Sequence, residues 1–231
     1  TTLELGGNGA TIIDDSADIE RAATACVMGG FGYSGQVCNS VQRVYIHRKR
    51  YDEFRDRFVR EVEQLTLGDP THEATDLGPL ISDAAVERIQ NWIAEAVQRG
   101  AKVLTGGNTE GRLFRPTVLE DVTEDMTVMC EEVFGPIVNL VPFDDFNAAL
   151  EAVNASEYGL QAGVFTNDLQ HAMLAARKLD VGGVMINNVS QWRVDQMPYG
   201  GNKNSGVGRE GPRFSVEEMT KLKMVSLYPG A

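Results

Sequence analysis

The chain has 231 residues, 42% hydrophobic and 23% charged, which is enough apolar material to bury a sizeable core and argues against disorder. A formal net charge of -12 and the lack of any apolar run of bilayer length argue against nucleic-acid and membrane partners, and leave small molecules and other proteins. Three widely separated cysteines, Cys26, Cys38 and Cys130, and three scattered histidines fit neither a disulfide framework nor a metal site, and favour a reducing cytoplasm.

Helical and strand patterns alternate along the first half of the chain. Residues 17–28 have the spacing of a helix, with Asp15 or Ser16 as its expected N-cap, and residues 41–47 have the pattern of a strand. The next helix has apolar residues at intervals of three and four, and its buried face is expected to hold Tyr51, Phe54, Phe58, Val62 and Leu65. Another helix is expected over residues 84–99.

The second half continues the alternation. Strands are expected at "KVLT", near "PTVLEDV" and at "PIVNLVPF", followed by a helix over 145–155, a strand "AGVFT", a helix over 168–179 and a strand "GGVMINN". This order predicts the α/β class, a largely parallel twisted sheet with helices on both faces. A loop rich in glycine and asparagine follows to residue 211. The final "TKLKMVSLY" is expected to be an isolated strand that adds to a partner's sheet.

Cys38 lies in the stretch "FGYSGQVCNS", which is unusual surroundings for a packed thiol. Gly32, Ser34, Gly35 and Gln36 make a mobile, polar approach that is typical of a side chain presented for chemistry. A free thiol has a pKa of about 8.5, so a nucleophilic cysteine needs backbone N–H groups, a helix N-terminus or a nearby base. The glycine-rich loop offers N–H groups. A thiol that is merely exposed or packed is the alternative interpretation.

Two acidic motifs offer further candidates. "LELGGN", residues 3–8, places Glu4 between two leucines, and apolar neighbours suit a carboxylate that acts as a general base near neutrality. A solvated glutamate on an edge strand is an equal alternative. "CEEVFGPIV", residues 130–138, sets Glu132 and Phe134 before a Gly-Pro corner. An acid and an aromatic ring there suit a ribose and a flat ring, or form a surface turn over the core.

The last motif, "MPYGGNKNSGVGREG", residues 197–211, has too many glycines for a packed element. It is either a loop that lines a pocket or a long connection ordered by Arg209 and Glu210. Its "GVGREG" satisfies the GxGxxG pattern of dinucleotide-binding loops, but no strand precedes it, so that use is rejected. In "QWRVDQ" just before it, the guanidinium of Arg193 suits either bidentate binding of a carboxylate or phosphate group or pairing with a nearby acid.

Together and in this order, the four stretches resemble the motifs of the aldehyde dehydrogenase superfamily. "LELGGN" resembles its Glu-Leu-Gly-Gly box, "GQVC" its Gly-Gln-x-Cys box, "EEVFGP" its ribose-contact box, and "PYGGNKNSGVGRE" its glycine-rich last box. The resemblance covers essentially the whole chain, and it implies the fold of the family's catalytic domain. Tyr199 stands where the family often has phenylalanine, and Asn8 stands where it commonly has lysine.

The resemblance implies that an aldehyde is oxidised to a carboxylic acid with NAD or NADP. Cys38 would be the nucleophile that forms a thiohemiacetal and then a thioester, Glu4 the base that activates the hydrolytic water, and Glu210 a second carboxylate that relays protons. The implied cofactor contacts are Leu5, Glu132 and Phe134, and the implied substrate contacts are Tyr199, Arg193 and Asn39.

The resemblance also implies what lies outside this chain. Family members are longer, and their N-terminal half carries most of the cofactor domain, so residues 1–215 are expected to be the catalytic domain alone and 216–231 a helix end with an oligomerisation strand. The fragment is expected to bind NAD(P) weakly and turn over negligibly, and the whole protein to be a cytoplasmic homo-oligomer. Two other functions stay open: a thioester or ester hydrolase without a cofactor, and a non-catalytic assembly module.

Overall fold

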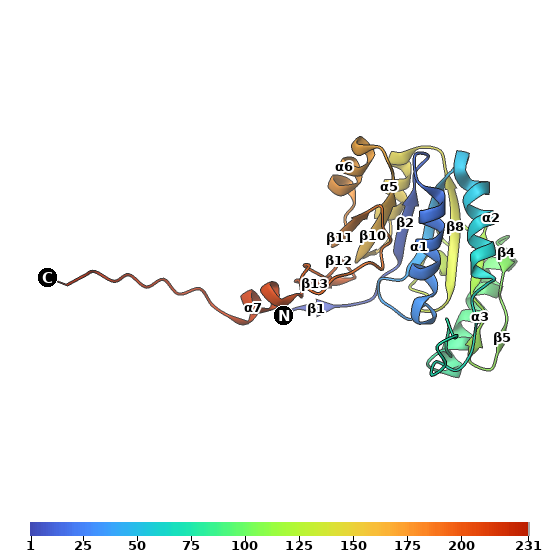
Figure 1. Cartoon of the computed structure of the whole chain (residues 1–231), viewed down its shortest axis with the longest axis horizontal. Helices are drawn as coiled ribbons and strands as arrows, with labels where there is room; N and C mark the ends of the chain where they lie inside the picture. The colour runs from blue at the N-terminus through green and yellow to red at the C-terminus, as the bar shows by residue number, and fades with distance from the viewer. Residues whose placement is uncertain (231) are drawn as a thin grey trace.

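The computed structural model describes residues 1–230, and a seven-stranded sheet of order β11-β10-β2-β3-β8-β7-β4 forms its centre (Figure 1). The strands of this sheet are β2 (Gly9–Ile13), β3 (Val41–His47), β4 (Lys102–Thr105), β7 (Thr117–Glu120), β8 (Ile137–Phe143), β10 (Gln161–Phe165) and β11 (Gly183–Ile186). Every neighbouring pair is parallel except β4 with β7, which confirms the prediction of a largely parallel sheet.

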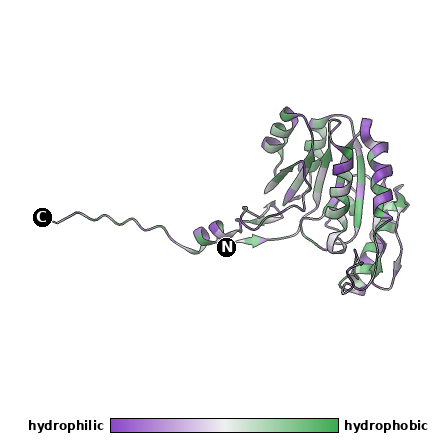
Figure 2. Cartoon of the chain, in the orientation of Figure 1, coloured by the Kyte–Doolittle hydropathy of each residue, from purple (hydrophilic) through white to green (hydrophobic). Residues whose placement is uncertain are grey.

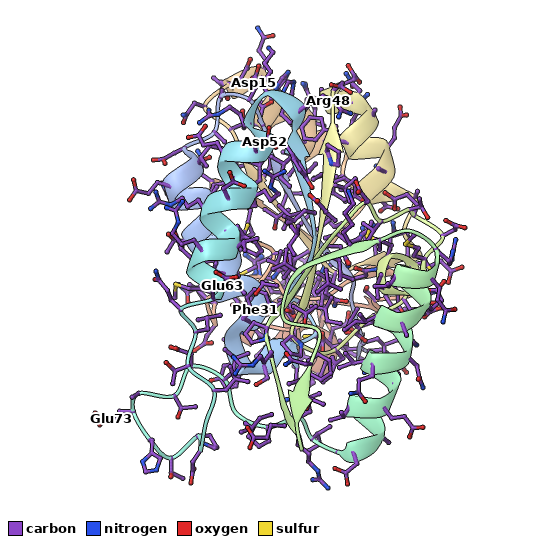
Figure 3. All side chains as sticks on the ribbon, turned by 90° about the vertical axis from the view of Figure 1, so that its right-hand side faces the viewer. Asp15, Phe31, Arg48, Asp52, Glu63 and Glu73 are labelled. Carbon is purple, nitrogen blue, oxygen red and sulfur yellow. The ribbon has the colours of Figure 1, made fainter. Side chains whose placement is uncertain are left out.

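Helices cover both faces of the sheet, as predicted. Adjacent residues of a strand point to opposite faces, so Ile13 packs in the cluster of α1 and α2, whereas Ile12 packs in the cluster of α3 and α5. Figure 3 shows α2, labelled at Asp52, on the opposite side of the sheet from α3. The helices that make these two layers are α1 (Ile19–Phe31), α2 (Tyr51–Val62), α3 (Asp83–Gln98), α5 (Phe146–Asn154) and α6 (Leu169–Lys178).

Short elements complete the chain. Two 3-10 helices, η1 and η2, and two further helices, α4 and α7, span Gly32–Gly35, Arg48–Arg50, Thr127–Cys130 and Pro212–Met219. Three antiparallel strand pairs lie outside the main sheet: β1 (Leu3–Glu4) with β13 (Gly206–Val207), β12 (Asn202–Lys203) with β9 (Tyr158–Gly159), and β5 (Thr109–Glu110) with β6 (Leu113–Phe114). Among residues 1–230, the helices are all too short or too polar to cross a bilayer.

Helix α1 begins later than the sequence predicts, because its cap is a different residue. The side chain of Asp18 accepts a hydrogen bond of 3.1 Å from the backbone N–H of Arg21 and so caps the helix. The two predicted caps are engaged elsewhere: Ser16 donates to the carboxylate of Asp14, and Asp15 pairs with Lys49. Helix α2 ends at Val62, so Leu65 lies beyond it.

Strand β2 is missing from the predicted elements, although it lies next to the central strand of the sheet. Its sequence "GATII" has no polar alternation, because all five residues are buried. A strand that is covered on both faces is expected to lack alternation. Its hydropathy is therefore no different from that of a short buried helical segment. Figure 2 shows the mainly hydrophobic strands between helices that carry both colours.

The C-terminal residues 220–230 leave one prediction open. They run extended and exposed away from the body of the molecule, without β-pairing to any other residue in 1–230 (Figure 1). "TKLKMVSLY" is thus not a strand in the single chain, because a strand needs a hydrogen-bonded neighbour. Its pairing with another chain stays a prediction. Its exposed apolar side chains are Leu222, Met224, Val225, Leu227 and Tyr228.

A buried carboxylate joins the ends of β2 and β10. Asp14 follows β2 and is 1% exposed. It accepts hydrogen bonds from the hydroxyl groups of Thr166 (2.6 Å) and Ser16 (3.1 Å), and Nδ1 of His171 lies 3.0 Å away. Burial works to raise the pKa of Asp14, but the hydrogen bonds from Thr166 and His171 outweigh it and hold that pKa below its ordinary value.

The Asp14→Asn variant should lose about 1–3 kcal/mol of unfolding free energy at neutral pH, because it removes a hydrogen-bonded buried carboxylate. A depressed pKa in the folded state stabilises the protein above the pKa of the unfolded chain, about 3.9, and this contribution disappears as the pH falls through the folded value. The difference from the parent chain should therefore shrink as the pH falls below about 4.

Urea denaturation of the parent and the variant, from neutral pH to below about pH 4, measures that difference. The Asp195→Asn variant is the control, since it makes the same change of side chain at an exposed position. A difference that does not change with pH would contradict the assigned role of the Asp14 charge.

Candidate active site

The loop that carries Cys38 has an unusual backbone conformation and is tied to its neighbours by hydrogen bonds. Tyr33, Ser34 and Gly35 have φ values of 53°, 57° and 68°, which is three successive residues in the left-handed region. The hydroxyl of Ser34 donates to the carbonyl of Gly78 at 2.8 Å, and the side chain of Gln36 accepts from a backbone N–H at 2.9 Å. The polar character of the loop fits a presented thiol, and the expected mobility of the loop stays a prediction.

Glycines let the predicted motifs touch through their backbones. A Cβ on Gly7 would lie 2.5 Å from the carbonyl oxygen of Cys38, so the first motif packs directly on the cysteine loop. A Cβ on Gly35 would collide with the carbonyl oxygen of Gly135, so the cysteine loop packs directly on the Gly-Pro corner. Only glycine permits these approaches, and Gly35 also has a positive φ.

The last motif closes onto the first. Strand β1 pairs with β13 so that Glu4 lies opposite Gly206, and the N–H of Leu5 donates to the carbonyl of Ser205 at 3.1 Å. Within the last motif, Tyr199 and Glu210 exchange two backbone hydrogen bonds of 3.0 and 2.7 Å. The motif therefore lines the thiol site and is not a mere connection.

Cys38 borders a cavity of about 420 Å³ at the start of β3. Its sulfur lies 3.1 Å from the phenol oxygen of Tyr199. The other two cysteines differ, since Cys26 is buried in the core and Cys130 is exposed on the surface. The cavity is lined by Met28, Gly32, Tyr33, Val37, Cys38, Asn39, Gln191, Arg193 and Tyr199.

The thiol of Cys38 is not activated in this chain. Burial raises its pKa, and the hydrogen bond from Tyr199 opposes burial without cancelling it. The nearby charge of Glu4 raises the pKa further, and the backbone N–H of Asn39 lowers it slightly. The backbone N–H groups of the loop thus lower the pKa of Cys38 less than the single phenol of Tyr199 does.

Glu4 reaches the thiol without being buried. Leu3 and Leu5 are each 47% exposed and Glu4 is exposed as well, so the apolar enclosure expected from "LELGGN" is not found in this chain. Glu4 is nevertheless close enough for its charge to raise the pKa values of Cys38, Tyr199 and Glu132. The fold therefore brings the predicted base, Glu4, close to the predicted nucleophile, Cys38, although they are 34 positions apart in the sequence.

The predicted cofactor residues lie beside the same glycines. The carboxylate of Glu132 accepts a hydrogen bond of 2.9 Å from the N–H of Gly7. Burial raises the pKa of Glu132, opposed by this bond and by Arg88. Phe134 has a φ of 46° and is 38% exposed, and Leu5 is also exposed. The carboxylate of Glu132 can accept hydrogen bonds from the hydroxyl groups of a ribose. The exposed side chains of Phe134 and Leu5 offer apolar surface for a flat ring such as the nicotinamide of NAD(P).

Arg193 pairs with an acid, one of the two outcomes that the sequence left open. Its guanidinium lies 2.9 Å from the carboxylate of Glu210 and stacks on the ring of Tyr199, 4.1 Å from the ring centre. Asn39 lines the cavity, but its amide donates to the carbonyl of Gln191 at 3.1 Å, which ties the cysteine loop to the loop of Arg193.

Four lining residues are not identified by the sequence, namely Met28, Tyr33, Val37 and Gln191. Met28 and Tyr33 are exposed although they belong to apolar residue types, and the backbone carbonyl of Gln191 accepts a hydrogen bond from Asn39. Gln191 opens the stretch "QWRVDQ", in which only the charged residues suggest a function. An exposed methionine in the last turn of α1 is visible only once the buried face of the helix is known.

Comparison with known proteins identifies close relatives. The model of the aldehyde dehydrogenase family matches residues 1–225. A 3-sulfolactaldehyde dehydrogenase from Priestia megaterium is 47% identical over 226 residues, which are 98% of this chain and 47% of the relative. The crystal structure of aldehyde dehydrogenase 21 from Physcomitrella patens, in complex with the reaction product succinate, has a TM-score of 0.92 and 44% identity and covers 94% of this chain and 46% of its own.

A second solved structure extends the comparison. Glyceraldehyde-3-phosphate dehydrogenase from Methanocaldococcus jannaschii, complexed with NADP, has a TM-score of 0.92 at 38% identity and covers 96% of this chain and 48% of its own. The chain thus spans about half the length of the relatives that it matches.

Replacing Gly35 by alanine should cost more stability than replacing another glycine of similar φ. Gly111 has a φ of 59° and open space where a Cβ would stand, so Gly111→Ala carries only the left-handed cost of about 1 kcal/mol. Gly35→Ala adds a collision with the backbone of Gly135. Urea unfolding of both variants, followed by circular dichroism, measures the difference. Equal losses would contradict the close packing of the two motifs.

Proposed function

Because the chain belongs to the aldehyde dehydrogenase family, we propose that it is the thiol-bearing part of an enzyme that oxidises a small aldehyde to a carboxylic acid with NAD or NADP. The observation that carries this proposal is the meeting of Cys38, Glu4 and Tyr199, which come from three distant stretches of the sequence. Residues 1–215 would form the catalytic domain and 216–231 the end that joins subunits.

Cys38 acts as the nucleophile. Its thiolate attacks the carbonyl carbon, the carbonyl electron pair moves to oxygen, and the backbone N–H of Cys38 would donate a hydrogen bond to that oxyanion. NAD(P), when bound, supplies the acceptor for the hydride that leaves the carbon. The acyl group is then held on the sulfur as a thioester. The acyl group of a thioester needs space beside the sulfur, and the cavity next to Cys38 offers that space, whereas the core around Cys26 does not.

Glu4 serves as the base of the second half-reaction. It removes a proton from water, the hydroxide adds to the thioester carbon, and the carbon–sulfur bond breaks to release the acid and the Cys38 thiolate. The exposure of Glu4 supports this role, since water reaches it directly. Glu210 relays protons onward only when its pairing with Arg193 opens.

Glu132, Phe134 and Leu5 form the cofactor side of the site. The carboxylate of Glu132, which here accepts from the N–H of Gly7, would accept hydrogen bonds from the ribose hydroxyl groups, and the exposed side chains of Phe134 and Leu5 would pack beside the nicotinamide. The remainder of the cofactor site lies in the half of the relatives that this chain does not cover. The whole protein is proposed to be a cytoplasmic homo-oligomer.

The substrate is proposed to be an aldehyde with an anionic tail. Arg193 is the charged residue among those that line the cavity beside Cys38. Its guanidinium has five N–H donors, so its pairing with Glu210 leaves donors free for a substrate. Three of the relatives are named for, or complexed with, compounds with anionic groups, namely sulfolactaldehyde, succinate and glyceraldehyde 3-phosphate, whereas others are named for lactaldehyde, which is uncharged. Asn39 and Tyr199 would form the uncharged wall beside the reacting carbon.

The acyl half-reaction can be tested on this chain without a cofactor. An activated ester such as p-nitrophenyl acetate should acylate Cys38, detected by intact mass and peptide mapping, and Cys38→Ser should abolish the label. Glu4→Gln should still acylate but should lose the acyl group about 10²-fold more slowly, because general-base catalysis is removed. Unchanged deacylation in Glu4→Gln would reject Glu4 as the base.

The redox half-reaction should require the other half of the enzyme. The chain alone should form no detectable NADH or NADPH from an aldehyde. A chimera that joins it to the uncovered part of the Priestia megaterium relative should do so. In that chimera, Arg193→Gln should lower kcat/KM for an anionic aldehyde about tenfold more than for a neutral one, since a charged contact is lost.

The matched control for this variant is Arg213→Gln, because Arg213 also pairs with a glutamate at 2.9 Å but lies outside the cavity. Equal losses for anionic and neutral aldehydes would show that Arg193 supports the loop and does not select the tail. Turnover by the chain alone would reject the view that its cofactor site is incomplete.

A further inference from the structure

The hydrogen bond between Tyr199 and Cys38 has a consequence for the chemistry of the sulfur. Tyr199 is 2% exposed, yet its phenol oxygen is only 3.1 Å from the sulfur and next to the cavity. We propose that Tyr199 is a positioning residue for the nucleophile, whose phenol O–H donates to the Cys38 thiolate and holds it at the cavity wall. This inference rests on the role of Cys38 proposed above.

The direction of the hydrogen bond follows from the protonation states of the two groups. Burial, and then the contact with Cys38, raises the pKa of Tyr199 well above that of a free phenol, so the phenol keeps its proton throughout the neutral range. A thiolate accepts hydrogen bonds and has no proton to donate. The bond is therefore strongest when Cys38 is ionised, and it favours that form against burial and the charge of Glu4.

The rest of the last motif holds the phenol in place. The backbone of Tyr199 exchanges two hydrogen bonds with Glu210, and the carboxylate of Glu210 binds Arg193. The guanidinium of Arg193 then covers one face of the ring at 4.1 Å, a distance at which a cation is attracted to an aromatic ring. This positive charge also lowers the pKa of Tyr199 in part, which makes the phenol a better donor.

The ring and the hydroxyl group make separable contributions. Phenylalanine at position 199 would keep the ring between Arg193 and the cavity and would lose only the donor. A thiol with fewer donors is ionised to a smaller extent, but its thiolate is a stronger nucleophile, because nucleophilicity rises with basicity with a coefficient of about 0.4–0.5. Removing the donor should therefore slow the thiol where it is mostly protonated and speed it where it is fully ionised.

The experiment is the pH profile of alkylation of Cys38 by iodoacetamide in this chain, with the modified peptide quantified by mass spectrometry. Suppose that Tyr199→Phe lowers the thiolate fraction of Cys38 about tenfold near neutral pH. Each remaining thiolate is then about threefold more nucleophilic, so the rate of alkylation falls about threefold. At pH values where both proteins are fully ionised, the variant should react about threefold faster. The midpoint of the profile should move to higher pH.

The matched control is Tyr51→Phe, which also removes one phenol hydrogen bond, to Glu120 at 3.1 Å, but lies on α2 away from the thiol. Its profile should coincide with that of the parent. The ultraviolet absorption of the thiolate, with Cys38→Ser as the blank, gives the ionisation midpoint without a reagent. If Tyr199→Phe reacts more slowly at every pH, the cysteine loop is displaced and the donor role is rejected. If the ionisation midpoint of Cys38 is unchanged in Tyr199→Phe, the inference is overturned.

These outcomes separate the inference from the proposed function. Alkylation and absorption need neither an aldehyde nor a cofactor, so a shifted midpoint supports the role of Tyr199 even if the chimera fails to oxidise any aldehyde. Conversely, an active chimera together with an unshifted midpoint would support aldehyde oxidation and reject the donor role of Tyr199.

Discussion

The candidate site depends on the close approach of backbones at glycines. The carbonyl of Cys38 occupies the space where residue 7 would carry a Cβ, and the carbonyl of Gly135 does the same at residue 35. Strand β13 lies equally close to Leu3 at Gly206. These contacts have no side chain between them, so the positions of the thiol, the first carboxylate and the Gly-Pro corner are set by the main chain. The motifs contain many glycines for this reason.

On that frame, the ionisation of Cys38 is a balance of opposing influences. Burial and the negative charge of Glu4 favour the neutral thiol, whereas the phenol of Tyr199 favours the thiolate. The balance lies on the side of the thiol in this chain. The arrangement is consistent with Glu4 as a base for water rather than for the sulfur, because a carboxylate held near a thiolate repels its charge.

The sequence predicted the α/β class, most helices and the residues that meet at the thiol, because buried faces and glycine-rich motifs leave local patterns. It failed where the deciding contact is distant in the sequence. Strand β2 has no pattern because both of its faces are covered, and Asp18 replaced the predicted caps because Asp15 pairs with Lys49 and Ser16 accepts a hydrogen bond from the N–H of Asn167. Likewise, the exposure of Glu4 and the partner of Arg193 follow from packing that no local motif encodes.

The position of the thiol at the start of β3 links its geometry to the whole fold. Only Asn39 and Ser40 separate Cys38 from Val41, the first residue of the middle strand of the sheet. A central buried strand opens only when the domain opens, whereas loops and sheet edges open in local fluctuations. The end of the cysteine loop that enters β3 should therefore keep its position until the whole domain unfolds, and native-state hydrogen exchange at β3 measures that opening.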